Sequence, residues 1–445
     1  MNGLERRGGA EAGEAAPAEP ASGRRAASAR EVAYYGEDVA VHAPSGIEEL
    51  RDLVRFAETE RRRIVPAGLG AHAGIADPPP AGALVVSACR FDAVAQYEPD
   101  DFTIGVGAGM PLASFRAALD EHRQELAVDL GRAARGTVGG LVARAPFGPR
   151  SAHSGKLSAL LLGVEGMRGG GKLFRSGGMV VKNVAGYQIG KFLAGAHGAG
   201  AILLRLNFKL RSRPSTRHAR LASFASSPQA LAFAAELRRA RLEPAVLAVL
   251  SGAAVDDVRE LGSPGRPGDW IVVWVFEGIE PRVAWLAKEA QRMAHRAQAN
   301  LSESLDGAAA TRMLDYLTEF ADAGPEPRED LGIVRVVVLP AALGQFEMRL
   351  RTAVWDREGI VAGFLADASS GSLVIRWTAE TSRVMEPLEE IRAAALAHGG
   401  RATLLHLPAS RRERCTRILT KDPSAVLTAR ILDVFDPARV FGGRK

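Results

Sequence analysis

Short apolar strands joined to glycine-rich turns dominate the first half of the chain. Residues 62–66 are typical of a short strand and lead directly into a turn, residues 67–74, that contains three glycines. A second pair of expected strands, 160–165 and 171–175, brackets the turn at residues 168–171. Glycine adopts positive φ and lets other groups approach the backbone closely, so turns of this kind suit ligand binding. The pattern predicts a strand-rich domain with ligand-binding loops.

The pattern changes after Pro214, which follows a long apolar strand at residues 201–210. Helices are then expected at 228–238, 281–298 and 385–398, and strands at 270–276, 332–339 and 372–377. This mixture predicts an α+β fold. We therefore divide the chain into a disordered tail over residues 1–30, a first domain over residues 31–213 and a second α+β domain over residues 214–445.

Composition and charge argue against several classes of function. The 445 residues are 47% hydrophobic and carry a net charge of +6, with acidic and basic residues interspersed. The absence of a basic stripe with interleaved aromatics argues against nucleic-acid binding. Cys89 and Cys415 are too few for a disulfide framework or a CxxC metal site and fit a reducing cytoplasm. Without a signal-peptide core or an apolar run of about 18 residues, we expect a cytoplasmic protein that lacks a transmembrane helix.

Two glycine-rich segments compete as nucleotide-binding sites. The first, Gly105-Val-Gly-Ala-Gly109, lies between an expected strand and an expected helix, with Asp129 about 20 residues further on. This arrangement imitates the βαβ unit of a Rossmann fold and would favour an NAD(P)-dependent dehydrogenase. However, Met110 stands where the pattern requires a glycine, and residues 93–107 pair more naturally as an antiparallel hairpin.

The second segment, Pro66-Ala-Gly-Leu-Gly-Ala-His72, is a turn that directly follows a strand. Successive backbone N–H groups in such a turn can point at one place and form an anion-binding nest for a pyrophosphate. On its own the motif fits a structural turn better than a binding site. The motifs that follow it in the chain favour the binding function.

These later motifs occur in a characteristic order. They are Leu126-Ala-Val-Asp-Leu130, Gly136-Thr-Val-Gly-Gly140, Gly148-Pro-Arg150, Lys182-Asn-Val-Ala-Gly-Tyr187, Gly399-Gly-Arg-Ala-Thr-Leu404 and Phe435-Asp-Pro-Ala-Arg-Val-Phe441. Together with the loop they resemble the FAD-binding domain of the vanillyl-alcohol-oxidase (PCMH) class, and within it the glycolate oxidase E subunit. The resemblance runs from about residue 37 to the end, and the block at residues 182–187 is its most specific element.

The resemblance implies a two-lobed α+β FAD-binding domain of the PCMH type, followed by an FAD-linked-oxidase C-terminal domain that caps the flavin. It also implies an oxidoreductase subunit that binds FAD non-covalently. Such a subunit would pass electrons from a small 2-hydroxy acid to a larger flavin-binding subunit and an iron–sulfur subunit. Two cysteines cannot ligate a cluster, so the cluster would lie on a partner. Any membrane association would also occur through partners.

The resemblance assigns cofactor-binding roles to individual residues. The pyrophosphate loop comprises Gly68, Leu69, Gly70, Ala71 and His72, and the opposite wall comprises Thr137, Gly139, Gly140 and Leu141. Ala143 and Gly148 would approach the isoalloxazine and ribityl groups, and Ile202 would meet the flavin or adenine through its backbone.

The chain also departs from the pattern of this class. The loop is Ala67-Gly-Leu-Gly70 in place of an Arg-Gly-Gly-Gly-like sequence, and Gln188 replaces an expected aspartate. These substitutions favour an alternative, in which the chain is a flavin-free scaffold subunit of such a complex. The histidine-rich Gly-Asp-Gly-Asn motif of related hydroxy-acid dehydrogenases is absent from the sequence. We therefore assign no metal ligands, and the sequence identifies no catalytic base.

Several polar residues have both a functional and a structural interpretation. His72 is a flavin ligand, a covalent attachment point or a loop histidine that caps backbone groups, and the last is favoured. His153 and Lys156 lie either at the flavin edge or in solvent, and the second is favoured. His398 and His406 are eight residues apart without a nearby carboxylate, which is a poor arrangement for a metal site.

Overall fold

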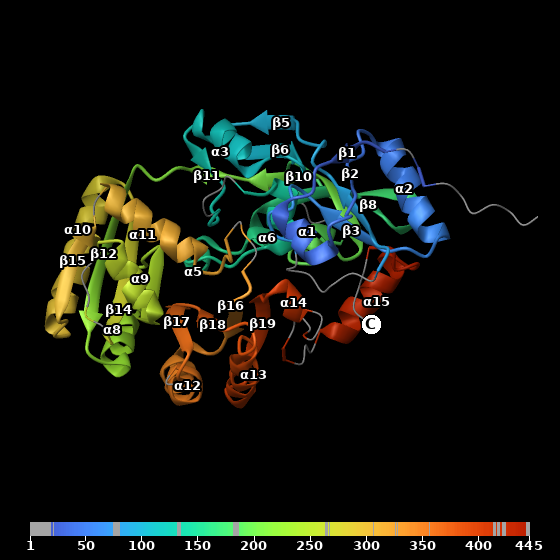
Figure 1. Ribbon diagram of the computed structural model, residues 1–445. Helices are drawn as coiled ribbons and strands as arrows, with labels where there is room; N and C mark the ends of the chain where they lie inside the picture. Colours follow the sequence, from blue (N-terminus) through green and yellow to red (C-terminus); the bar gives the residue numbers. More distant parts are fainter. Residues whose placement is uncertain are drawn as a thin grey trace, which may run out of the picture.

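The computed structural model describes residues 19–20, 22–73, 81–130, 135–180, 187–262, 266, 268–305, 307–324, 326, 328–355, 357–412, 415, 419–420 and 424–441. Within these residues the chain forms three main β-sheets and a two-stranded ribbon (Figure 1). Two of the sheets lie in the N-terminal half and the third in the C-terminal half. The predicted α+β fold class is confirmed.

The first sheet contains β1 (Arg24–Arg25), β2 (Val41–His42), β4 (Leu84–Ser87) and β3 (Ile64–Ala67), in that order. β2, β4 and β3 run parallel, whereas β1 pairs antiparallel with β2. Helix α2 (Ile47–Thr59) packs on this sheet because Leu50, Leu53, Val54 and Ala57 recur at helical spacing and are all buried. Sheet and helix together form the first lobe.

The second sheet is antiparallel throughout and forms the second lobe. Its strands, in order, are β5 (Val94–Glu98), β6 (Thr103–Gly107), β10 (Ala201–Lys209), β8 (Leu161–Arg168) and β9 (Lys172–Gly177). Its helices are α3 (Leu112–Asp120), α4 (Val138–Arg144), α5 (Ser151–Ser154), α6 (Leu157–Leu160) and α7 (Ile189–Leu193), and the 3-10 turn Gly169–Gly171 joins β8 to β9. The ribbon pairs β7 (Gln124–Glu125) with β11 (Arg211–Ser212).

The expected hairpin is confirmed, and it excludes the Rossmann interpretation. β5 pairs antiparallel with β6, and β6 pairs antiparallel with β10 on its other side, so Gly105 does not lie in a parallel βαβ unit. The glycines of this segment serve packing instead. A Cβ atom at Gly107 would lie 2.0 Å from the carbonyl oxygen of Phe91, and one at Gly109 would lie 2.0 Å from that of Ala88.

The third sheet is antiparallel and belongs to the C-terminal half, which we call the cap. Its strands, in order, are β15 (Leu301–Leu305), β12 (Thr216–Phe224), β14 (Trp270–Gly278), β13 (Val246–Gly252), β17 (Ile360–Asp367), β18 (Ser372–Ala379), β16 (Leu331–Val337) and β19 (Arg401–His406). Among the described residues, the helices and strands expected after Pro214 are present at the predicted positions. A 3-10 turn, Pro340–Ala342, and a π-helical turn, Arg351–Trp355, flank helix α12 (Leu343–Leu350).

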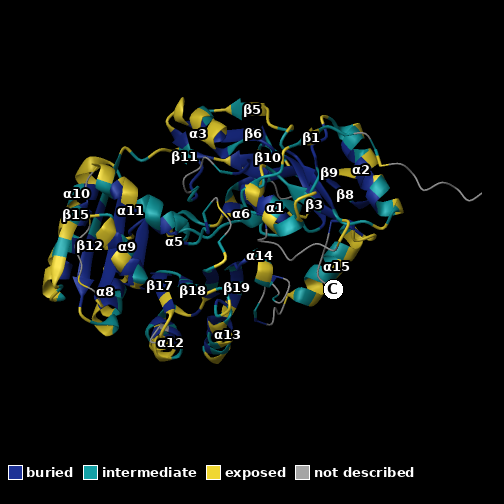
Figure 2. Cartoon of the chain, viewed as in Figure 1, coloured by how far each residue is buried: buried dark blue, intermediate teal, exposed yellow. Residues whose placement is uncertain are grey.

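The two faces of the cap sheet differ. The outer face is covered by α8 (Ser227–Arg239), α10 (Glu280–Arg296), α12 (Leu343–Leu350) and α13 (Glu386–Ala397), whose outer sides are exposed (Figure 2). On the inner face, α9 (Ala253–Glu260) and α11 (Gly307–Glu319) pack mainly over β12, β13 and β17. The remaining inner face, at β18, β16 and β19, therefore faces the first two lobes.

The predicted disordered tail begins to fold earlier than expected. Residues 1–18 lie outside the described residues, but β1 is paired, and Ser28 and Glu31 form a capping box at the start of α1 (Ala29–Tyr35). Arg25 makes an ion pair of 2.6 Å with Glu31, whose side chain is 1% exposed. The expectation that residues 22–30 are disordered is thus wrong. A capping box and one buried ion pair order this segment although it has no hydrophobic period.

The C-terminal segment returns to the first lobe. After α14 (Ala409–Arg412) and α15 (Ala425–Phe435), Val440 and Phe441 join the core that contains α2. The amide of Ile64 donates a 2.7 Å hydrogen bond to the carbonyl of Val440, which covers the free edge of β3. The domain boundary at residue 214 remains a proposal. The structure adds that residues 440–441, from the second domain, pack with the first lobe.

Candidate functional site

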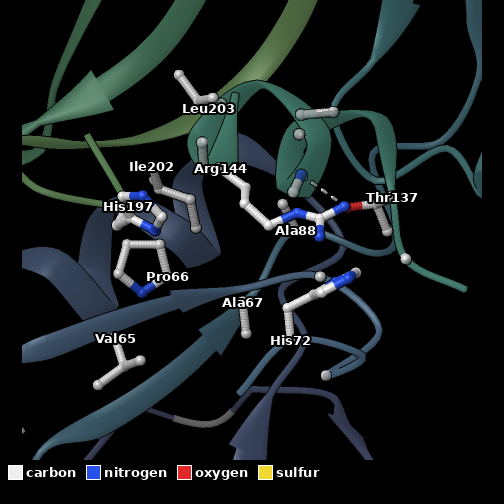
Figure 3. A pocket seen from close by; sticks show the side chains of 18 of the residues that line it. Val65, Pro66, Ala67, His72, Ala88, Thr137, Arg144, His197, Ile202 and Leu203 are labelled. Atoms are coloured by element: carbon white, nitrogen blue, oxygen red, sulfur yellow. Dashed lines mark hydrogen bonds between the residues drawn. The ribbon is translucent and has the colours of Figure 1, made fainter. Parts of the chain in front are cut away.

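A cavity lies where the loop after β3 meets α4 and the start of β10 (Figure 3). It contains about 1050 Å³ of empty space, counting the part that is open to solvent. Ten of the twelve residues assigned from the sequence line this first cavity: Gly68, Leu69, Gly70, Ala71, His72, Thr137, Gly139, Gly140, Ala143 and Ile202.

The loop after β3 is held from outside the cavity. The carbonyl of Gly68 accepts a 2.6 Å hydrogen bond from the Ser87 hydroxyl, and that of Gly70 accepts one of 3.1 Å from Ser28. Gly70 has a φ of +72°, and a Cβ there would lie 2.3 Å from a carboxylate oxygen of Glu31. Glycine is therefore required at residue 70 by the packing of the N-terminal helix, as well as by the turn itself.

Helix α4 forms the opposite wall. The Thr137 hydroxyl accepts a 3.1 Å hydrogen bond from the amide of Gly140 and so caps the N-terminus of α4. Gly139 packs against the backbone of Ala108, where a Cβ would lie 2.8 Å from the carbonyl oxygen. Gly140 is exposed, and a Cβ there would have only the Thr137 hydroxyl within 4 Å, at 3.4 Å. Gly140 is thus the place on this wall where a side chain could enter the cavity without displacing the fold.

Two assigned residues do not line the first cavity. Leu141 is 2% exposed and packs in the core of the second lobe, because it shares the buried face of α4 with Val138 and Val142. Gly148 lies against the side chain of Asp129 and borders a different cavity. Of the motif at 182–187, only Tyr187 is within the described residues, and its side chain is 90% exposed.

A second cavity continues from the first toward the cap. The two share His72, Arg144 and His197, and the second is completed by Asp322 and Arg335 from the cap. In Figure 3 the side chain of Arg144 extends from α4 into the first cavity, on the side where His72 lies. Sequence reasoning missed Arg144, His197, Asp322 and Arg335. None of them belongs to a local pattern, and Asp322 meets His72 across 250 residues.

The contact between His72 and Asp322 joins the glycine loop to the cap. Nε2 of His72 lies 3.3 Å from a carboxylate oxygen of Asp322. The pKa of His72 is lowered to about 4, because burial and the charge of Arg144 disfavour the imidazolium more than Asp322 favours it. Burial raises the pKa of Asp322, but the hydrogen bond from His72 and the charge of Arg144 lower it by more. The pKa of Asp322 therefore lies below its ordinary value. At neutral pH a neutral imidazole therefore donates from Nε2 to the carboxylate of Asp322.

The burial of His72 and His406 predicts a pH-dependent stability. The pKa values of His72 and His406 are both lowered to about 4, chiefly by burial. Between pH 6.5 and about 4 the unfolded chain therefore binds protons that the folded chain does not, so the free energy of unfolding falls as the pH falls. We expect His72→Asn to reduce this slope, as measured by urea unfolding at pH 7.0, 5.5 and 4.5. Replacement of the exposed His295 by Asn should leave the slope unchanged, and an unchanged slope in His72→Asn would contradict the assignment.

Comparison with known families identifies the cofactor of the chain. Residues 39–191 match the FAD binding domain family, and residues 213–445, more than half of the chain, match the C-terminal domain family of FAD linked oxidases. The chain belongs to the FAD-linked oxidases. It is accordingly an oxidoreductase, and FAD is its cofactor.

Curated relatives agree with this assignment. Glycolate oxidase subunit GlcE of Escherichia coli (strain K12) is 32% identical over 170 residues, which is 38% of this chain and 47% of that protein. Glycolate oxidase subunit GlcD of Bacillus subtilis (strain 168) is 24% identical over 234 residues, covering 52% of this chain and 50% of that one. A D-2-hydroxyglutarate dehydrogenase of Xanthomonas citri pv. viticola is 29% identical over 224 residues, 46% of each chain. The matches thus span about half the length of these relatives.

Solved structures share the fold at low identity. A p-cresol methylhydroxylase with substrate bound superposes with a TM-score of 0.68 at 13% identity, covering 90% of this chain and 87% of that one. An alkyldihydroxyacetonephosphate synthase gives a TM-score of 0.67 at 15% identity, covering 91% and 77%. These likenesses confirm the architecture of an FAD-binding PCMH-type domain followed by a cap.

The residues of the first cavity fit FAD. Glycine backbone lines two of its walls, Gly140 is open, and the buried Nε of Arg144 has no hydrogen-bond partner among the described residues. Among the described residues, no cluster of histidine, cysteine, aspartate or glutamate is arranged to hold a metal ion. In that same part of the chain, no helix has both the length and the apolar character needed to cross a bilayer.

Proposed function

We propose that the chain is the FAD-binding subunit of a glycolate-oxidase-like complex and takes part in the oxidation of a small 2-hydroxy acid. The observation that carries the proposal is the continuity of the first and second cavities at His72, Arg144 and His197. A cofactor in the first cavity would border the second cavity, which is closed by the inner face of the cap. A small acid could approach it there, between Arg144 and Arg335.

The residues of the first cavity would bind the dinucleotide non-covalently. The backbone of the loop from Gly68 to His72 would hold the pyrophosphate, and Thr137, Gly139, Gly140, Ala143 and Ile202 would form the remaining contacts. When bound, FAD supplies the acceptor for the hydride that leaves the hydroxyl-bearing carbon. Arg144 would orient the anionic substrate, and the cap would exclude water from the junction.

The relatives that are named glycolate oxidase subunits support the proposal that this chain works as one subunit of a complex. In this proposal the partners are a larger flavin-binding subunit and an iron–sulfur subunit, in the cytoplasm or at a membrane to which the partners attach it. The full sequence has only Cys89 and Cys415, so the cluster would reside on the partner.

Purified full-length chain should be yellow, with a flavin absorption spectrum that is released from the protein on denaturation. Anaerobic addition of a 2-hydroxy acid to the chain with its partners should bleach the flavin. Colourless protein that takes up no added FAD would overturn the proposal in favour of a flavin-free scaffold. Flavin that is retained but bleached by no 2-hydroxy acid would contradict the substrate class alone.

A further inference from the structure

Helix α15 is apolar in sequence but is not buried in the chain. Eight of its 11 residues are apolar, yet none of the 11 is buried (Figure 2). The four helices on the outer face of the cap differ, because each of them buries a row of apolar residues against the sheet. A helix as rich in apolar residues as α15 is normally enclosed by protein. It therefore presents an apolar face that the described residues leave uncovered.

One side of α15 is held against the second lobe. The ring of Phe435 lies 4.8 Å from the ring of Phe174 on β9, measured between their centroids. Leu432 packs close to Gly200 at the start of β10, where a Cβ atom would lie 2.9 Å from the Cδ2 atom of the leucine. The helix is thus anchored through its C-terminal half, and its opposite side points away from the lobe.

The outward side of α15 carries three large apolar side chains. Val426, Leu427 and Val434 are 66%, 62% and 78% exposed. Residues 427, 430 and 434 recur at helical spacing, so the apolar side chains form one stripe with Arg430 among them. Apolar side chains that gather in this way on one exposed face mark an interaction site more often than single exposed ones do.

Tyr187 extends this face beyond the helix. Phe174, which contacts α15, and Ser176 are two residues apart on β9 and project from the same side of the strand. The hydroxyl of Ser176 donates a 2.8 Å hydrogen bond to the carbonyl of Tyr187, whose side chain is 90% exposed. Tyr187 therefore lies on the same side of β9 as α15. We call Tyr187, Val426, Leu427 and Val434 the α15 surface.

Three exposed cations border the α15 surface. Arg430 lies within the stripe, Lys172 lies on β9 two residues before Phe174, and Lys191 lies on α7, which packs beside β9. None of the three cations makes an ion pair with a described residue. The acidic residue of α15, Asp433, is paired with Arg439 at 2.8 Å and leaves no net charge there. The surface thus has an apolar centre and a positive rim.

We propose that the α15 surface is the docking site of a different protein, whose own face has an apolar centre bordered by carboxylates. The inference deepens the proposed function, which gives the chain partner subunits. An apolar centre with a polar rim is the usual anatomy of a protein interface, and opposite charges at the rim steer the partners together. A two-fold dimer of this chain would contact the same patch on both copies and bring its cations against one another. Charge complementarity therefore favours an acidic partner over a second copy.

The first experiment traps the occupant of the surface. The full-length chain is expressed in its source organism with the photo-crosslinker p-benzoylphenylalanine in place of Leu427. A control carries the crosslinker in place of Leu339, which is 72% exposed on the cap. We expect residue 427 to crosslink to one protein other than the chain itself, and we expect residue 339 not to. The trapped protein, once purified, is the probe for the affinity measurements.

The second experiment titrates the trapped protein with purified full-length variants. Leu427→Asp should weaken binding about thirtyfold or more, as the loss of an apolar anchor at the centre of an interface does. Arg430→Glu should weaken binding about tenfold and flatten its dependence on salt, whereas Arg430→Lys should bind like the parent. Leu339→Asp and Arg349→Glu make the same changes at exposed residues of the cap and are the matched controls.

Several results would overturn the inference. One is a crosslink between two copies of the chain, with a dimer in analytical ultracentrifugation that Leu427→Asp dissociates. Another is flotation of the parent, but not of Leu427→Asp, with vesicles of phosphatidylglycerol and phosphatidylcholine, which would assign the surface to a membrane. A loss of thermal stability in isolated Leu427→Asp would show that the chain itself covers the surface. Absence of any crosslink, or equal affinity of Leu427→Asp and the parent for the trapped protein, would also refute the docking site.

Failure of the docking site and failure of the proposed function give different results. A trapped partner that is neither a flavoprotein nor an iron–sulfur protein would refute the proposed complex and retain the docking site. A reconstituted complex that oxidises a 2-hydroxy acid and assembles as tightly with Leu427→Asp as with the parent would retain the function and refute the docking site.

Discussion

Gly140→Asp is expected to lower the affinity for FAD about a thousandfold. The new carboxylate would extend into the first cavity from the exposed wall of α4, close to where we place the pyrophosphate. Two like charges about 4 Å apart repel each other by about 4 kcal/mol at an effective dielectric constant of about 20. The fold should tolerate the change, because the residue lies in the first turn of α4, where a negative charge interacts favourably with the helix dipole.

Gly140→Asn is the matched control for this experiment. It adds nearly the same volume without the charge, so the difference in FAD affinity between the two variants isolates electrostatic repulsion. Affinity is measured by fluorescence titration of the apo chain with FAD, and thermal unfolding of both variants checks the fold. Equal affinities for Asp and Asn at residue 140 would show that the pyrophosphate lies elsewhere. Gly70 is a poorer position for this test, because a side chain there collides with Glu31 whether or not a cofactor binds.

Glu277→Gln is expected to cost about 3–5 kcal/mol of stability, the range for a buried ion pair that loses one partner. Glu277 is the second-last residue of β14 in the cap, and its side chain is 3% exposed. Its carboxylate lies 2.8 Å from Nε of Arg217, 3.0 Å from an Nη of Arg211 and 3.4 Å from an Nη of Arg150. Arg150 and Arg211 belong to the second lobe and also pair with Asp129 and Glu125, respectively, so the variant removes the buried carboxylate that ties these cationic groups to the cap.

The measurement is urea unfolding at pH 7, with Glu280→Gln as the control. Glu280 is 61% exposed and pairs with His218, so its replacement should change stability by less than about 1 kcal/mol. Burial raises the pKa of Glu277, but Arg150, Arg217 and Arg211 lower it overall. The network therefore stabilises the fold above about pH 4.5 and loses this contribution as the pH falls through the lowered pKa. A Glu277 variant as stable as the Glu280 variant would show that Glu125 and Asp129 together satisfy the arginines.

The sequence was most informative where the physical cause is local. The hairpin of β5 and β6 follows from alternating residues around the turn at residues 98–101, and α8, α10 and α13 follow from helical periodicity. The capping box at Ser28 and Glu31 is also local. It was overlooked because the surrounding segment lacks apolar residues.

The candidate site was only partly accessible to sequence reasoning. The glycine loop and α4 were found through resemblance, since glycine spacing alone also fits a structural turn. Leu141 was assigned to the cavity because the motif was followed along the chain, whereas the helical turn places Gly139, Gly140 and Ala143 at the cavity and Leu141 in the core. Asp322 and Arg335 reach the site only through the packing of the cap on the lobes. No pattern within either domain specifies that packing.

The return of the C-terminal segment to the first lobe has a consequence for the order in which the site is assembled. The edge of β3, which leads into the glycine loop, is completed by Val440. Because Val440 follows the cap in the chain, this edge receives its backbone partner only after the cap has been synthesised. The strand that leads into the glycine loop is thus completed by a segment from the other side of the cap.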